Sequence, residues 1–326
     1  MFRKLLFPLS LIYGLGAVLN RRLYELDVKK SYKLPLPVIS VGNLSVGGTG
    51  KTPTVISIAK YFQNKNKRVL ILSRGYKRKS KEILFCNKDI PVELCGDEPK
   101  VMSMKGFDVV VSTDRVNGFE MFKGKINPDI VILDDGYQHH PIKKDINILV
   151  IDTTKPFWED RLLPAGRLRE PKSFFKYADC FIITRFDRVK DKELFLEKLK
   201  TFDKPYFIAR EQFGKLYNST KKIDFNSLKG RSVIVMAGIG NNSQFFDKMK
   251  ELSLKYGFYI ESFLGFPDHY DYKNFIPDAN KIYITTEKDI VKLNFPNIFA
   301  LDYSFEFDRE FYRYLEGMLD GREKSF

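Results

Sequence analysis

Residues that bind transition metals or form cross-links are scarce in this sequence of 326 residues, which contains three cysteines and three histidines. Cys86, Cys95 and Cys180 have no spacing typical of metal ligands, and their number is odd. A reducing, cytoplasmic compartment fits this cysteine usage best. Because histidine is rare, each histidine is informative about a site.

The sequence also lacks an apolar run long enough to span a bilayer, which takes about 20 residues. The run from Leu5 to Leu19 is shorter. A signal peptide would fit the basic start of the chain, but no small-x-small cleavage site follows. Two alternatives remain, an amphipathic helix on an anionic leaflet and a helix packed on the protein's own core. We expect residues 1–30 to form a membrane-associating amphipathic helix, with Arg3, Lys4, Arg21, Arg22, Lys29 and Lys30 as its basic flanks.

The composition excludes a disordered chain and indicates about two globular domains. Hydrophobic residues make up 44% of the sequence and charged residues 29%. The net charge of +14 favours a polyanionic partner, which could be nucleic acid, an acidic membrane surface or a phosphorylated substrate. A basic surface that only keeps the protein soluble would explain the charge as well.

A glycine-rich stretch follows the β-branched run from Val38 to Val41 and precedes a segment of helical period. This is the strand–loop–helix context of a phosphate-binding loop, in which backbone N–H groups and a helix N-terminus surround an anion. The strict pattern G-x-x-x-x-G-K-[ST] would place glycine where this chain has Ser45, so the loop is a variant, and a glycine-rich hairpin with a surface lysine is the alternative. The predicted nucleotide-binding residues are Gly47, Gly48, Thr49, Gly50, Lys51 and Thr52, with Lys51 reaching the phosphates of ATP and the Thr52 hydroxyl binding Mg²⁺.

Short apolar runs alternate with helical segments from residue 38 to about residue 185. This pattern predicts an α/β fold, a parallel sheet like that of P-loop nucleoside triphosphate hydrolases with helices on both faces. The rhythm is lost between about 186 and 230, and a second αβ pattern follows. We therefore expect a P-loop domain over 31–210 and a smaller α/β domain over 211–326 that contributes to the same cleft. The predicted strands are 38–41, 68–73, 108–112, 129–133, 147–151, 180–184, 232–237, 259–264 and 281–285.

Carboxylates follow two of the predicted strands. Asp134 and Asp135 end a buried run, and a carboxylate beside a phosphate-binding loop can hold Mg²⁺ directly or through water. Adjacent side chains on a strand point in opposite directions, so one of the two is expected to bind directly. Asp97 lies in a polar loop, where a carboxylate could take the proton of an acceptor hydroxyl. Taken alone, the Asp97 motif indicates only a polar turn before a helix, and His269 in a Pro-Asp loop is more often structural than catalytic.

Arginines also occur at predicted strand ends and in loops, where they could stabilise a transferring phosphoryl group or bind an acceptor phosphate. Taken singly, each is better explained as a surface ion pair. In order along the chain, however, all these motifs resemble those of the tetraacyldisaccharide 4′-kinase family, the lipid A 4′-kinases of Gram-negative bacteria. The family shares the imperfect phosphate-binding loop, whereas Lys77, Tyr137, Tyr270 and residues 157–160 depart from its usual pattern. The resemblance covers nearly the whole chain and rests on residues 42–53, 73–76, 96–99, 134–139, 163–170, 237–240, 266–269 and 286–289.

The resemblance implies a P-loop kinase that uses ATP and Mg²⁺ to phosphorylate the 4′-hydroxyl of a tetraacyldisaccharide 1-phosphate. It implies Asp97 as the catalytic base, assisted by His269 from the second domain. The acyl chains of such a substrate lie in a bilayer, so we expect a peripheral or monotopic protein on the cytoplasmic face of the inner membrane. The other implied roles are Lys51 and Arg115 in catalysis, Thr52, Asp134 and Asp135 at the metal, and Arg74, Tyr76, Arg169 and Glu170 at the substrate.

Two other classes of function are weaker. An ATPase associated with nucleic acid would use the positive charge, but it needs exposed aromatics among basic residues and no membrane-seeking N-terminus. A nucleotide switch without enzymatic activity would leave Asp97 and His269 without a task. We therefore expect a monomeric enzyme whose partners are a lipid substrate and an anionic membrane surface, and no nucleic acid.

Overall fold

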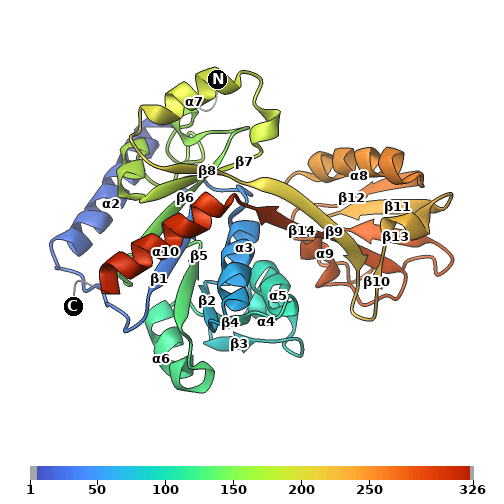
Figure 1. The fold of residues 1–326 in the computed structure, drawn as a ribbon, viewed down its shortest axis with the longest axis horizontal. Helices are drawn as coiled ribbons and strands as arrows, with labels where there is room; N and C mark the ends of the chain where they lie inside the picture. Colours follow the sequence, from blue (N-terminus) through green and yellow to red (C-terminus); the bar gives the residue numbers. More distant parts are fainter. Residues whose placement is uncertain (1–5, 324–326) are drawn as a thin grey trace.

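The apolar runs of the first half of the chain form an eight-stranded sheet in the computed structural model, which describes residues 6–323 (Figure 1). The strand order is β3-β4-β2-β5-β1-β6-β7-β8, and all neighbours are parallel except β3 and β4. This confirms the predicted α/β class with a parallel sheet. The strands are β1 (Val38–Gly42), β2 (Val69–Ser73), β3 (Leu84–Cys86), β4 (Asp108–Val111), β5 (Ile130–Asp134), β6 (Ile146–Asp152), β7 (Cys180–Thr184) and β8 (Tyr206–Ile208).

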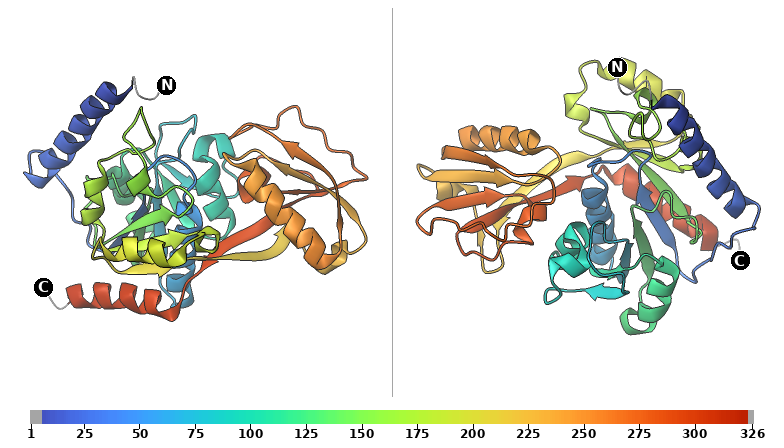
Figure 2. Two further views of the ribbon diagram at one scale, coloured as in Figure 1. Left: turned by 90° about the horizontal axis from the view of Figure 1, so that it is seen from above. Right: turned by 180° about the vertical axis from the view of Figure 1, so that it is seen from behind.

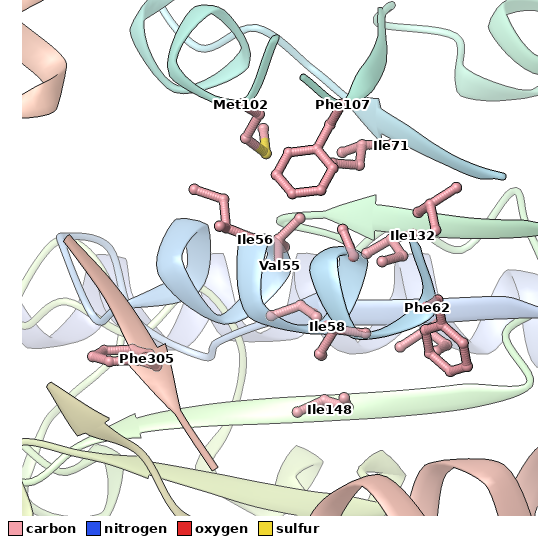
Figure 3. Close-up of a cluster of buried hydrophobic side chains, with 14 of the residues drawn as sticks. Val55, Ile56, Ile58, Phe62, Ile71, Met102, Phe107, Ile132, Ile148 and Phe305 are labelled. Atoms are coloured by element: carbon pink, nitrogen blue, oxygen red, sulfur yellow. The ribbon is translucent and has the colours of Figure 1, made fainter. Parts of the chain in front are cut away.

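Alternate side chains of these strands pack on opposite faces of the sheet, as the period of two requires. Ile132 and Ile148 face one layer of helices, and Figure 3 shows them gathered with Ile58 and Phe62 of α3. Leu133 faces the other layer. The helices of this part are α3 (Lys51–Asn64), α4 (Val92–Cys95), α5 (Asp97–Met104), α6 (Arg115–Ile126) and α7 (Lys192–Lys200), with short 3-10 helices η1 (Phe157–Glu159), η2 (Lys172–Tyr177) and η3 (Phe186–Arg188).

A second, six-stranded sheet forms the smaller lobe, with the order β10-β9-β14-β13-β11-β12. Its core lies between the sheet and α8, where Val235, Met249 and Ile284 are buried. The predicted strand–helix pattern of this half is therefore confirmed. Its elements are β9 (Arg210–Tyr217), β10 (Lys222–Ile223), η4 (Phe225–Leu228), β11 (Ser232–Ala237), α8 (Asn242–Tyr256), β12 (Tyr259–Gly265), β13 (Ile282–Thr285), α9 (Glu287–Ile290) and β14 (Ile298–Glu306).

Two long antiparallel strands, β9 and β14, connect the lobes (Figure 1). At the end of β14, Phe305 packs in the core of the large sheet, and its backbone oxygen accepts a hydrogen bond of 2.6 Å from the Ser57 hydroxyl. The last helix, α10 (Arg309–Glu323), then packs Phe311 and Leu315 in the same core. The predicted smaller domain, 211–326, thus includes a C-terminal helix, α10, whose apolar side chains are buried in the core of the large sheet.

The N-terminal helix α2 (Phe7–Glu25) lies along the large lobe, on the side away from the smaller lobe (Figures 1 and 2). Its buried residues are small or polar, namely Ser10, Gly14 and Arg21, whereas Leu9, Leu11, Leu15 and Leu19 are exposed. The Ser10 hydroxyl donates to the backbone oxygen of Leu162 at 3.1 Å, and a Cβ on Gly14 would lie 2.7 Å from the same leucine. Arg3 and Lys4, counted among the basic flanks, lie outside the described residues.

None of the helices within residues 6–323 combines the length and the hydropathy that crossing a bilayer requires.

Cys86 at the end of β3 and Cys95 at the end of α4 form a disulfide, with their Cα atoms 5.8 Å apart. The sequence interpretation in terms of a reducing compartment did not foresee this pair, because a distance between two residues cannot be taken from their spacing alone. The third cysteine, Cys180, is a buried thiol in β7. The pair joins the edge strand to the segment that leads into α5.

Candidate active site

The phosphate-binding loop connects β1 to α3, as predicted. Gly47 and Gly50 have φ angles of +115° and +95°, in the region that glycine adopts without strain. A Cβ on Gly50 would also lie 2.9 Å from the ring of Phe305. Helix α3 begins at Lys51 with no side-chain cap and no acidic residue in its first turn, so its N-terminus remains electropositive. Gly48, Thr49 and Thr52 complete the loop and the first turn.

Lys51 lies among groups of both signs at the carboxyl edge of the sheet. Its Nζ donates to Asn43 Oδ1 at 3.1 Å and lies 3.5 Å from Asp135 Oδ1. Burial lowers the pKa of Lys51, and the Asp135 carboxylate opposes this shift. Asn43 was not among the predicted site residues, although its place between β1 and the glycines would have been a signal.

The two aspartates at the end of β5 have different environments. Asp134 is buried and accepts a hydrogen bond of 2.8 Å from the Ser73 hydroxyl. Burial, together with the neighbouring Asp135 carboxylate, raises the pKa of Asp134 to about 6. Asp135 has a left-handed φ of 49°, which turns its side chain towards Lys51. Burial disfavours its charge, but Lys51 and Arg169 outweigh burial and hold the pKa of Asp135 well below its usual range.

Arg169 binds Asp135 through both ends of its guanidinium, with two contacts of 2.8 Å. It also donates to the backbone oxygen of Asn43 at 3.1 Å, so it fixes the start of the loop relative to the end of β5. Arg115, at the start of α6, is buried and donates to the backbone oxygen of Asp135 at 3.4 Å. Burial lowers the pKa of Arg115. The sequence analysis placed both arginines at strand ends or in loops; in the structure Arg115 begins α6, and both arginines contact Asp135.

Asp97 and His269 are 172 residues apart in the sequence, yet His269 Nδ1 lies 2.8 Å from Asp97 Oδ2. Asp97 opens α5 in the large lobe, and His269 follows β12 in the smaller lobe. His269 has a left-handed φ of 65°, an uncommon conformation that the surrounding chain must hold in place. Burial disfavours the Asp97 charge, but hydrogen bonding from His269 and the charge of Lys292 keep the pKa of Asp97 below its usual value.

The Asp97–His269 pair lies near enough to the phosphate-binding loop for charges beside the pair to act on Lys51 and Asp134. The charge of Glu98, next to Asp97, contributes to the raised pKa of Asp134, and the charge of Lys288 acts on Lys51. The Tyr76 side chain is exposed, with its ring centroid 5.8 Å from that of His269. Arg74, at the other end of the same turn, is exposed.

Glu170 lies behind Arg169 in a second buried cluster. Its carboxylate pairs with Arg21 of α2 at 3.2 Å and accepts from Gln138 at 3.0 Å. The Arg21 guanidinium in turn stacks 3.9 Å from the centroid of the Tyr177 ring. The sequence analysis counted Arg21 only as a basic flank, because the docking of α2 brings it to Glu170, and it gave Gln138 no role at the site.

A cavity of about 350 Å³ lies where α2 meets this cluster. One wall consists of α2 residues, and the other contains Arg169 and Glu170. Arg169, which binds Asp135, is therefore also part of the cavity wall. Its lining residues are Tyr13, Gly16, Ala17, Asn20, Gln138, His140, Arg169 and Glu170.

Several buried polar atoms at this edge have no hydrogen-bond partner within the described part of the chain. They include Thr49 Oγ1, Asn43 Nδ2, Arg169 Nε and Glu98 Oε2. Buried polar atoms are normally paired, so unpaired ones gathered at one place fit a site that binds a polar ligand.

Comparison with known proteins identifies the family. A profile of the family described as tetraacyldisaccharide-1-P 4′-kinase matches residues 2–320. The chain belongs to this family. It is 42% identical over 318 residues to the tetraacyldisaccharide 4′-kinase of Aquifex aeolicus, covering 95% of this chain and 96% of that protein. The protein of the same name from Flavobacterium psychrophilum is 34% identical, with 96% and 97% covered.

A solved structure from the same family supports the assignment. The crystal structure of the Aquifex aeolicus protein in complex with ATP has a TM-score of 0.85, with 39% identity and 98% of each chain covered. The family resemblance, the fold class and the kinase function, phosphorylation of a tetraacyldisaccharide at its 4′ position, are thereby confirmed.

Proposed function

We propose that this chain transfers the γ-phosphate of ATP to the 4′-hydroxyl of a tetraacyldisaccharide 1-phosphate, with Asp97 as the base. The 2.8 Å contact between His269 and Asp97, made across the two lobes at the edge that carries the phosphate-binding loop, supports this proposal most directly. In the reaction, the hydroxyl oxygen attacks the γ-phosphorus while its proton passes to Asp97. The bond from the γ-phosphorus to the bridging oxygen breaks, and ADP leaves.

The phosphate-binding loop would hold the triphosphate. Residues 47–50 present backbone N–H groups, and the α3 N-terminus adds its positive dipole end. Lys51 would turn from Asp135 to the phosphates, because a doubly charged γ-phosphate attracts it more strongly than one carboxylate. Arg115, buried beside Asp135, would stabilise charge on the transferring group.

Thr52 and Asp134 suit a magnesium ion, since both offer hard oxygen ligands and Asp134 is a buried carboxylate with a raised pKa. No cluster of three or more His, Cys, Asp and Glu side chains suited to a metal occurs within residues 6–323. Mg²⁺ in kinases usually takes one or two carboxylates and completes its shell with phosphates and water. We assign Asp134 rather than Asp135 as the direct ligand, because the Arg169 guanidinium already pairs with both oxygens of Asp135. The ion would supply charge neutralisation at the phosphates.

The disaccharide would lie between Tyr76 and the cavity beside α2. Arg169 and Glu170 line that cavity, and Tyr76 lies next to His269, so the three side chains mark two ends of one acceptor site. Arg74, exposed beside Tyr76, would face an acceptor phosphate. The Gly16 and Ala17 side of the cavity leaves room for apolar chains along α2.

The outward apolar face of α2 supports binding to the surface of a membrane. Helices on globular proteins normally bury their apolar side chains, whereas α2 buries Ser10, Gly14 and Arg21. Such an inverted helix fits an interface, where its leucines enter the acyl region and basic residues meet anionic head groups. We propose a monomer bound peripherally to the cytoplasmic face of the inner membrane. Sedimentation with vesicles of phosphatidylglycerol and of phosphatidylcholine, at low and high salt, tests the surface, and analytical ultracentrifugation tests the monomer.

The reaction is tested by following labelled γ-phosphate from ATP–Mg²⁺ to a detergent-solubilised tetraacyldisaccharide 1-phosphate. We expect label on the lipid with the wild-type chain and none with Lys51→Ala. Asp97→Asn should bind nucleotide normally and lose most of kcat. Consumption of ATP without labelled lipid would contradict the acceptor, and stimulation by nucleic acid would favour the alternative ATPase.

A further inference from the structure

Lys292 is a buried cation that none of the roles above uses. It lies just after α9 in the smaller lobe, and only 8% of its side chain is exposed. Its Nζ is 2.7 Å from Asp97 Oδ2 and has no other polar partner within the described residues. The contact is an ion pair outside the angular range of a hydrogen bond. A lysine is rarely buried unless its charge is paired, so its place beside Asp97 needs an explanation.

Both partners of Asp97 meet the same oxygen. His269 Nδ1 and Lys292 Nζ lie 2.8 and 2.7 Å from Oδ2. The other oxygen, Oδ1, accepts no hydrogen bond from residues 6–323. A carboxylate held at one oxygen has a fixed orientation, and its second oxygen remains available to a substrate hydroxyl. Two different elements of the smaller lobe, the loop after β12 and the end of α9, therefore determine how a group of the large lobe is aimed.

We propose that Lys292 is a positioning residue for the catalytic base: with His269 it holds Oδ2 of Asp97, so that Oδ1 receives the proton of the acceptor hydroxyl. This inference rests on the proposed role of Asp97. The Lys292 charge, together with hydrogen bonding from His269, also holds the pKa of Asp97 below its usual value. Asp97 thus stays ionised at the pH at which a kinase needs a base.

The charged and titratable groups around Asp97 decide the expected pH dependence. Besides His269 and Lys292, they are Glu98 on its own helix, Lys288 on α9, and Asp268 and Tyr272 in the loop after β12, with Asp268 Oδ2 3.8 Å from His269 Nε2. Glu98 is paired with Lys288, so these two charges largely compensate. Burial raises the pKa of Asp97, and the Lys292 charge lowers it. Without that charge the pKa of Asp97 should therefore move upwards.

The competing explanation is that Lys292 only holds the two lobes together. Lys105 offers a matched control, because it is also a mostly buried lysine that pairs across the lobes. Its Nζ lies 2.6 Å from both Glu287 and Asp302, and within residues 6–323 it makes no ion pair with Asp97. If lobe contact is all that matters, Lys105→Met and Lys292→Met should impair the enzyme in the same way.

The experiment measures kcat and both KM values from pH 5.5 to 9 for the wild type, Lys292→Met, Lys292→Arg and Lys105→Met. We expect Lys292→Met to lower kcat about 10- to 100-fold, part of what a positioned base contributes. Its KM values should stay within about twofold, and the acidic limb of its kcat profile should move to higher pH. Lys292→Arg keeps the charge and should recover part of kcat. Lys105→Met should keep the wild-type pH profile.

Asp97→Asn and the double variant Asp97→Asn/Lys292→Met separate this inference from the role of Asp97. If Asp97→Asn is inactive while Lys292→Met has a normal kcat and profile, the positioning role is wrong and the base stands. If Asp97→Asn keeps its kcat, the base assignment fails first. If Lys292→Met does not fold, Lys292→Gln, which also removes the charge but keeps a polar side chain, decides: an unshifted acidic limb with wild-type kcat at every pH would overturn the proposal. Equal activity of the double variant and Asp97→Asn supports it.

Discussion

Replacing two outward side chains of α2, Ile12→Ala and Leu15→Ala, should release the protein from membranes while leaving its fold intact. In the structure 66% of Ile12 and 70% of Leu15 is exposed, so neither holds the helix on the protein. The buried face, which includes Gly14 against Leu162, is unchanged. Replacing these two side chains therefore tests whether a membrane covers the outer face of the helix.

The size of the effect follows from the area available for burial. Burying a whole leucine or isoleucine side chain is worth about 1.5–3 kcal/mol. About two-thirds of each side chain is exposed, so entry into the acyl region is worth about 1–2 kcal/mol for each residue and about 2–4 kcal/mol for both. Since 1.4 kcal/mol corresponds to a factor of ten, the partition coefficient should fall roughly 30- to 700-fold.

The assay is sedimentation with vesicles of phosphatidylglycerol and phosphatidylcholine at several lipid concentrations. Leu254→Ala is the control, because Leu254 is 87% exposed but lies on α8 of the smaller lobe. We expect it to bind vesicles like the wild type, and we expect all three proteins to have the same melting temperature. A loss of less than about threefold for the α2 variant, or an equal loss for Leu254→Ala, would refute a membrane-facing α2.

Three further predictions concern the site. Asp134→Asn should raise the free energy of unfolding by up to about 3 kcal/mol in EDTA at pH 7.5, because the raised pKa of about 6 makes ionisation costly in the folded state only. This gain should be absent at pH 3.5, below both pKa values, and urea titrations at the two pH values measure it. Gly50→Ala should cost about 1–3 kcal/mol of stability and abolish ATP binding, since φ is +95° and the added Cβ meets Phe305, whereas Gly48→Ala meets open space. Arg169→Lys should lower kcat/KM about tenfold or more, because a lysine cannot reproduce the two contacts with Asp135.

Each of these predictions has an outcome that contradicts its reasoning. Equal stability of Asp134→Asn and the wild type at pH 7.5 would mean that the carboxylate ionises without cost. Similar melting temperatures and ATP titrations for the two glycine variants would remove the conformational argument for residue 50. A lysine at position 169 that supports normal turnover would show that charge alone suffices there.

The sequence predicted those parts of the molecule whose signals are local. Residues 38–53 carry the strand, the glycines and the helix of the phosphate-binding loop within one short segment, and the structure has them where they were expected. Asp97 and His269 are different, because spacing alone gave no reason to pair them. The family resemblance brought them together, and the structure shows the contact.

Other features could not be predicted because they depend on long-range docking. Arg21 reaches Glu170 only after α2 has packed on the loop that contains Leu162. Lys292 meets Asp97 only when the two lobes adjoin. The apolar face of α10 packs on the large sheet, although the chain reaches it from the smaller lobe. Periodicity shows that a helix has an apolar face, but it does not show which sheet the face will cover.

The pair of strands that joins the lobes makes the smaller lobe an insertion in the large one: the chain leaves through β9 and returns through β14. Removing everything after residue 210 would therefore also remove Phe305 and Phe311 from the core of the large lobe. An internal deletion that closes β9 onto β14 with a tight turn is the way to isolate the nucleotide-binding half. In such a deletion Asp97 would lose both His269 and Lys292, its two partners from the smaller lobe.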